Sequence, residues 1–124
     1  MKKLISTLAF VLGLVALSFA QDAKNTAMSQ GADELAKSKN SGTYVYTLPD
    51  GITEEQVTKA ASYYPDNFTV SFEASTGEAT VEITGDHARS SQIMIRFLSG
   101  CGVRYVDVDG ENHELYAFYT DYLK

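Results

Sequence analysis

Cysteine is nearly absent from this chain, and tryptophan is absent altogether. The 124 residues include one cysteine, Cys101, and no tryptophan. A single cysteine cannot form a disulfide bond within the chain, although an intermolecular disulfide or a free thiol remains open. Hydrophobic residues make up 44% of the sequence, which is enough for one small core. Burial of apolar side chains must therefore supply the stability that disulfides provide in many small exported domains.

Positive charge is scarce. Ten Lys and Arg residues stand against 16 Asp and Glu, giving a formal net charge of -6. Two of the ten, Lys2 and Lys3, lie at the extreme N-terminus. Without them, 8 basic residues remain against the same 16 acidic ones, a formal charge of -8. Because an acidic surface repels phosphate backbones, we expect no nucleic-acid partner.

Residues 1–20 have the organisation of a secretory signal peptide. Lys2 and Lys3 precede an apolar stretch from Leu4 to Phe19, and Ser18-Phe19-Ala20 places small residues where a signal peptidase cleaves. The apolar stretch is short for a membrane span. We therefore expect a protein that is exported to the periplasm or the extracellular space and has no membrane association after cleavage.

Motifs for catalysis are also missing. The sequence has no Gly-x-Ser-x-Gly, no phosphate-binding glycine loop and no cysteine–histidine pair with a third residue to orient it. His87, Ser90 and Ser91 lie within one predicted helical turn. We attribute this proximity to chance and not to a catalytic dyad. We expect no enzymatic activity and no cofactor.

The segment 21–42 contains no aromatic residue and is rich in Lys, Asn, Ser, Gln, Gly and Ala. Such a composition buries too little apolar surface to offset the entropy lost on ordering the chain. The composition predicts a flexible leader over 21–42, with at most a weak helix from Ala32 to Lys39.

A regular alternation of strand and helix patterns begins at Thr43. The apolar periodicity predicts a ferredoxin-like α+β domain over 43–108, with the order βαββαβ and both helices on one face of an antiparallel sheet. Thr53 and Gln56 form a capping box at the start of the first helix. The predicted strands are 43–48, 68–75, 79–84 and 103–108, and the predicted helices are 53–64 and 86–101. Residues 109–124 form a C-terminal extension that packs on the domain or extends it, in which Leu115 to Tyr119 is an extra strand or a short helix.

The stretch Gly51-Ile52-Thr53-Glu54-Glu55-Gln56-Val57 resembles the metal-binding loop of heavy-metal-associated (HMA) domains, which reads Gly-Met-Thr-Cys-x-x-Cys. Phe68-Thr-Val-Ser-Phe-Glu, Thr76-Gly-Glu-Ala-Thr-Val, Ile93 and Gly102-Val103 follow in the order that these domains show. The resemblance implies the ferredoxin-like fold. Glu54 and Val57 replace the two metal-binding cysteines, so the paired thiolates that hold Cu(I) or Zn(II) are missing. We therefore expect no metal at this loop.

Cys101 leaves a second hypothesis open. In the predicted topology, the turn after the second helix lies at the same end of the domain as the Pro49–Glu54 loop. Cys101 and Glu54 are thus candidate ligands for a heavy-metal-binding protein of the periplasm. The alternative is that Cys101 is a small buried residue at the end of an apolar helix face.

Other candidate ligands have structural explanations. His87 and His113 have no potential ligand at i+2, i+3 or i+4, and surface positions are expected for both. Asp107, Asp109 and Glu111 resemble part of a calcium loop, but the position of Gly110 does not fit an EF-hand. We interpret this stretch as a solvated strand end.

Eight tyrosines are present, and several could form a partner surface. Exposed aromatic patches mark binding surfaces, whereas partial burial in strands would explain the same residues. The residues that we identify as a candidate surface are Tyr44, Tyr46, Tyr116, Phe118 and Tyr119.

The sequence favours an exported, non-enzymatic binding or interaction module with a degenerate HMA fold, whose partner is another protein or the chain itself. A heavy-metal-binding protein that uses Cys101 and Glu54 is the first alternative. An assembly subunit that self-associates through the tyrosine-rich tail or a sheet edge is the second.

Overall fold

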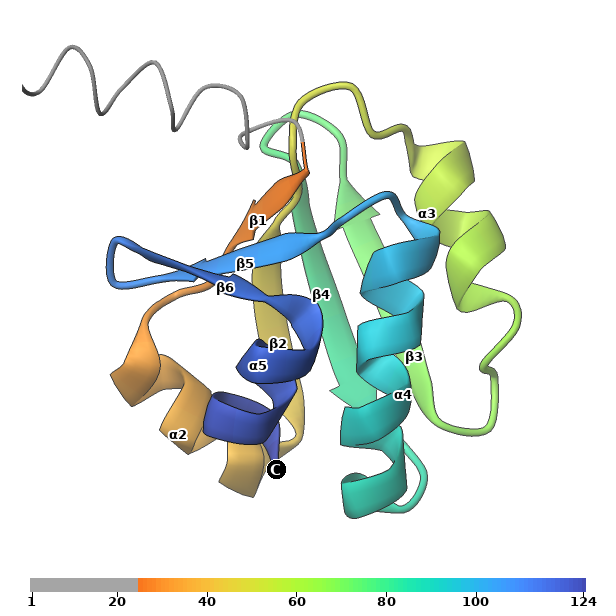
Figure 1. Cartoon of the computed structure of the whole chain (residues 1–124). Coiled ribbons are helices and arrows are strands. Elements are labelled where there is room, and N and C mark those ends of the chain that lie inside the picture. The colour runs from red at the N-terminus through yellow and green to blue at the C-terminus, as the bar shows by residue number, and fades with distance from the viewer. Residues whose placement is uncertain (1–24) are drawn as a thin grey trace, which may run out of the picture.

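The computed structural model describes residues 25–124; residues 1–24, and with them the predicted signal peptide, lie outside the described part. One mixed sheet and its helices form the α+β architecture that the sequence predicts (Figure 1). The strands are β1 (Thr26–Met28), β2 (Thr43–Thr47), β3 (Phe68–Glu73), β4 (Glu78–Ile83), β5 (Tyr105–Val108) and β6 (Glu111–Glu114). The helices are α2 (Ala32–Ser41), α3 (Glu54–Ala61), α4 (His87–Gly100), α5 (Leu115–Phe118) and the π-helical η1 (Tyr119–Leu123). No helix within residues 25–124 combines the length and apolarity needed to cross a bilayer.

Local sequence signals explain α3 and the hairpin beside it. The Thr53 side chain accepts a hydrogen bond from the Gln56 amide, and the Gln56 side chain accepts one from the Thr53 amide, which confirms the predicted capping box. Strands β3 and β4 pair antiparallel from Phe68 opposite Ile83 to Glu73 opposite Glu78. The period-two alternation therefore places one set of side chains toward the helices and the other toward solvent.

The sheet corrects the prediction of a flexible leader. Its strand order is β3-β4-β2-β1-β5-β6, so β1 lies inside the sheet, antiparallel to β2 and parallel to β5. Ala27 is completely buried there. A three-residue strand is too short to show an alternating pattern, which is why composition alone did not reveal it. The weak helix expected from Ala32 is present as α2.

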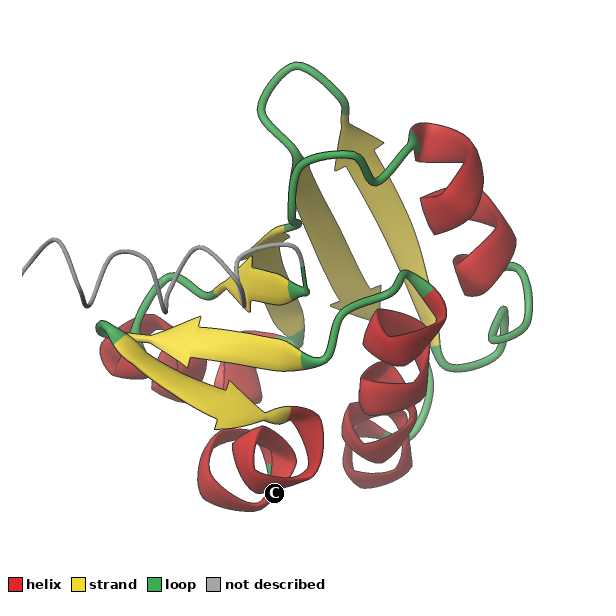
Figure 2. Cartoon of the chain, turned by 45° about the horizontal axis from the view of Figure 1, so that its top comes forward, coloured by secondary structure: helices red, strands yellow, loops and turns green. Residues whose placement is uncertain are grey.

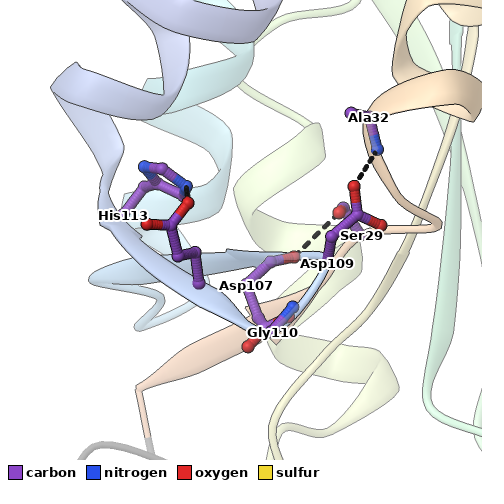
Figure 3. Close-up of polar contacts among 7 residues, drawn as sticks. Ser29, Ala32, Asp107, Asp109, Gly110 and His113 are labelled. Carbon is purple, nitrogen blue, oxygen red and sulfur yellow. Dashed lines mark hydrogen bonds and ion pairs between the residues drawn. The ribbon is translucent and has the colours of Figure 1, made fainter.

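The turn between β5 and β6 holds this N-terminal segment in place (Figure 3). The Ser29 hydroxyl donates to the Asp107 carbonyl at 2.7 Å, and the Ala32 amide donates to the Asp109 carboxylate at 3.1 Å. Gly31 precedes α2 with φ of +103°, and a Cβ there would lie 2.7 Å from an Asp109 carboxylate oxygen. Asp109 thus caps α2, which is far away in sequence. The residue just before this helix, Gly31, has a backbone conformation that favours glycine.

Helix α4 forms the centre of the core. Met94, Phe97 and Leu98 are completely buried on one side of it, facing the sheet. Phe97 meets Phe68 of β3 edge to face at 5.7 Å between ring centroids. Burial of each such side chain contributes about 1.5–3 kcal/mol. Helices α3 and α4 lie side by side over the β3–β4 part of the sheet, while α2 packs against β2 and η1 (Figure 2).

Burial of β1 predicts that Ala27→Asp destabilises the protein strongly. An unpaired carboxylate inside the sheet should lower the free energy of unfolding by about 3–5 kcal/mol. Ala74→Asp makes the same change at an exposed position after β3 and should have little effect. Urea unfolding of the two variants checks this. Equal stability would mean that β1 is dispensable.

Loss of the Asp109 cap predicts a smaller effect. Asp109→Ala should lower the free energy of unfolding by about 1 kcal/mol, because the Ala32 amide loses its acceptor. Asp109→Asn keeps an acceptor oxygen and tolerates the positive φ of 53° at this residue, so it should recover most of that loss. If both variants were as stable as the wild type in urea, the cap would contribute nothing.

Candidate functional site

Glu54 and Val57, the residues of the loop that stand where HMA domains have cysteines, lie in different environments. Glu54 is exposed in the first turn of α3, and Val57 is buried in the core. Cys101, which follows α4, is only 1% exposed. Within the part of the chain that the structure describes, no three His, Cys, Asp or Glu side chains come together to hold a metal. Of the two candidate metal ligands, Glu54 is thus a solvated carboxylate and Cys101 is an enclosed thiol.

Burial also changes the acidity of Cys101. Desolvation raises the pKa of its thiol from an ordinary 9.0 to about 11. The unfolded thiol would ionise from about pH 9, whereas the folded one stays protonated. Because only the unfolded chain ionises in this range, Cys101 lowers the free energy of unfolding as the pH rises from about 9 to 11. Below that range its ionisation does not change the free energy of unfolding. At neutral pH the native thiol is a poor nucleophile and a poor metal ligand.

Three of the five aromatic residues predicted to form a partner surface are buried. Tyr44, Tyr46 and Phe118 have no exposed area, which corrects that prediction for them. The Tyr46 hydroxyl donates to the Met94 sulfur at 3.0 Å, and the Tyr44 hydroxyl lies 3.3 Å from His87 Nε2. Because α4 provides partners for both hydroxyls, whole tyrosine rings can be buried beneath it.

The remaining predicted residues range from exposed to buried. Tyr116 is 78% exposed, and Tyr119 is partly buried against the core. His113 is mostly enclosed and meets the Tyr122 ring edge to face at 5.3 Å, which corrects its predicted surface position. Asp107 is also buried, and its carboxylate accepts a hydrogen bond from the Gly110 amide, so it stabilises the β5–β6 turn rather than a solvated strand end.

A groove lies between α3 and α4. Its volume is about 430 Å³, within the range of small-molecule sites. The two helices are in close contact where Gly100 meets Ala60, since a Cβ on Gly100 would lie 3.3 Å from the Ala60 Cβ. The groove is lined by Gln56, Lys59, Ala60, Tyr63, Tyr64, Arg96 and Gly100.

The charged side chains in this α3–α4 groove are both cations. Lys59 comes from α3 and Arg96 from α4, and neither forms an ion pair with any residue in the described part of the chain. The Gln56 oxygen is occupied by the Thr53 amide, which leaves the Gln56 NH₂ group to donate. No carboxylate lines the groove. The groove therefore presents two cations and no acidic side chain to an approaching ligand.

Tyrosines form the apolar wall of the groove. Tyr64 packs against Phe68, with 5.9 Å between ring centroids, and so is held by the core. Tyr63 meets Tyr64 edge to face at 6.3 Å and is 67% exposed. The wall is therefore one anchored ring beside one ring with a free face, a combination suited to a flat apolar group.

A second groove lies on the other side of α4. Its lining residues are Gln92, Ile95, Arg96, Tyr116, Tyr119 and Lys124, and its volume is about 410 Å³. Arg96 borders both grooves, so α4 presents one cation between two tyrosine-lined hollows. Two of the predicted surface residues, Tyr116 and Tyr119, thus line this second groove.

Sequence reasoning missed Lys59, Tyr63 and Arg96. A partial signal existed around α3, because Gln56 and Lys59 of the helix and Tyr63 just after it recur at i, i+3 and i+7 beside the apolar face. Nothing in the sequence places Arg96 opposite them. That relation comes from how α4 packs beside α3.

The comparisons with known proteins add no relative. No protein-family model, no curated protein and no solved structure matches this chain.

The enclosed thiol predicts slow alkylation. At pH 8, iodoacetamide should modify Cys101 in the native protein at least about 100-fold more slowly than in urea, because both burial and the raised pKa lower the amount of reactive thiolate. Mass spectrometry follows the reaction, and Cys101→Ser gives the background. Equal rates in the two states would show that the thiol is accessible and open to a ligand role.

Proposed function

We propose that this chain is an exported, non-enzymatic binding module whose binding site is the α3–α4 groove. The observation that carries the proposal is the set of donors that Gln56, Lys59 and Arg96 present without any facing carboxylate. Lys59 and Arg96 are exposed beside a hollow, and a ligand with acceptor groups can form charge-assisted hydrogen bonds with them.

A ferredoxin-like core of HMA type, with a degenerate metal loop, is part of this proposal. From β2 to β5 the elements run strand, helix, strand, strand, helix, strand, which supports it. The insertion of β1 between β2 and β5 is the departure, because the first and last strands of a ferredoxin-like sheet are direct neighbours. The exposure of Glu54 and the burial of Val57 support a structural role for this loop, which turns the chain and caps α3.

The absence of enzymatic activity is also proposed. His87 is engaged with the buried Tyr44 hydroxyl, and Ser90 and Ser91 are buried. These groups therefore do not form an accessible nucleophile and base. The groove itself contains Lys59 and Arg96 but no carboxylate that could serve as a general base.

Amide chemical-shift mapping tests the location of the site. A set of small organic acids, bases and neutral compounds should perturb the amides of α3 near Lys59 and of α4 near Arg96 in the protein lacking residues 1–20. The open face of β3 and β4 should stay unchanged and serves as the internal control. Perturbations confined to that face, or none from any compound, would contradict the proposal.

A further inference from the structure

We infer that the ligand of the α3–α4 groove is a small molecule with a single carboxylate on a flat apolar body. This inference rests on the proposed function and adds the chemistry of the ligand. It follows from three properties of the groove, namely the placement of its cations, the nature of its wall and the charge of the surrounding protein.

The cations select an anion. Arg96 presents a planar fork of donors that matches a carboxylate, and Lys59 on the facing helix adds a point charge. The Gln56 NH₂ group lies on the same face of α3 as Lys59, one turn toward its N-terminus. Glu54 and Glu55 line a neighbouring hollow together with Lys59, but no ion pair joins either of them to it. A carboxylate can therefore meet donors from both helices.

The wall selects a flat apolar body. Ala60 and Gly100 form a floor without polar side chains, and Tyr64 is held against the core by Phe68. Tyr63 exposes most of its ring beside them. Aromatic rings of this kind gain energy by stacking or edge contacts with another planar group. A bare anion would leave this surface unused.

The net charge selects a small monoanion over a polyanion. The protein carries 16 acidic residues, including Glu54 and Glu55 in the first turn of α3, which line a hollow next to the groove. Repulsion from these charges acts over about 10 Å at 0.1 M salt, so a long polyanion would meet it along its length. A single carboxylate within the groove is close to Lys59 and Arg96 and avoids most of it.

Titration calorimetry with 4-phenylbutyrate tests the inference. We expect one site per chain, with binding that weakens about tenfold or more in Arg96→Gln and in Lys59→Gln, because each removes a charged hydrogen bond. The neutral amide 4-phenylbutyramide should bind the wild type at least about tenfold more weakly, and so should acetate, which lacks the apolar body.

Matched variants control for charge and folding. Arg89→Gln makes the same change on α4 outside both grooves, and Lys37→Gln makes it on α2, so both should bind as the wild type does. Lys124→Gln tests the neighbouring groove and should also leave affinity unchanged. Circular dichroism establishes that each variant is folded.

The outcomes separate this inference from the proposed function. If 4-phenylbutyramide binds the groove as tightly as the acid, or if acetate or inorganic phosphate does, the ligand class is wrong while the site stands. If Lys124→Gln weakens binding and Lys59→Gln does not, the carboxylate occupies the other groove and the inference is overturned. If no compound of any charge reaches the groove in the shift mapping, the proposed function fails first.

Discussion

The packing of α4 against the tyrosines of β2 is the interaction on which the rest of the structure depends. Tyr44 and Tyr46 stack nearly parallel, with 6.5 Å between their ring centroids, and α4 supplies partners for both hydroxyls. This contact fixes the rotation of α4 about its axis. Its apolar side is buried, and Arg96 is consequently directed toward the grooves on either side.

The sequence predicts those elements whose signals are local. The capping box at Thr53 and the alternation from Phe68 to Ile83 specify α3 and the β3–β4 hairpin with only small differences in their ends. Strand β1 could not be predicted, because Thr26 to Met28 is ordered by its neighbours β2 and β5 rather than by its own composition. The Asp109 cap of α2 likewise could not be predicted, because Asp109 and Ala32 meet only in the folded chain.

The candidate site shows the same difference between features with a local sequence signal and features that depend on the fold. Reasoning from residue types directed attention to Cys101 and the tyrosines, because thiols and aromatic clusters are recognisable in a sequence. Cys101, Tyr44 and Tyr46 instead contribute to the core, where burial raises the pKa of each side chain. The groove depends on Lys59 and Arg96, which are ordinary surface residues until α3 and α4 are placed side by side. The loop that resembles a metal-binding loop lies at one end of the domain, whereas the hydrogen-bond donors of the groove lie along α3 and α4.

The central claim is that Arg96 meets an anion in the groove. The most direct measurement follows the Nε–H resonance of the Arg96 side chain by NMR while 4-phenylbutyrate is added. We expect a saturable shift of the Arg96 signal, with the Arg89 signal unchanged on the same helix. An Arg96 signal that stays in place, or that moves together with Arg89 in proportion to ionic strength alone, would contradict it.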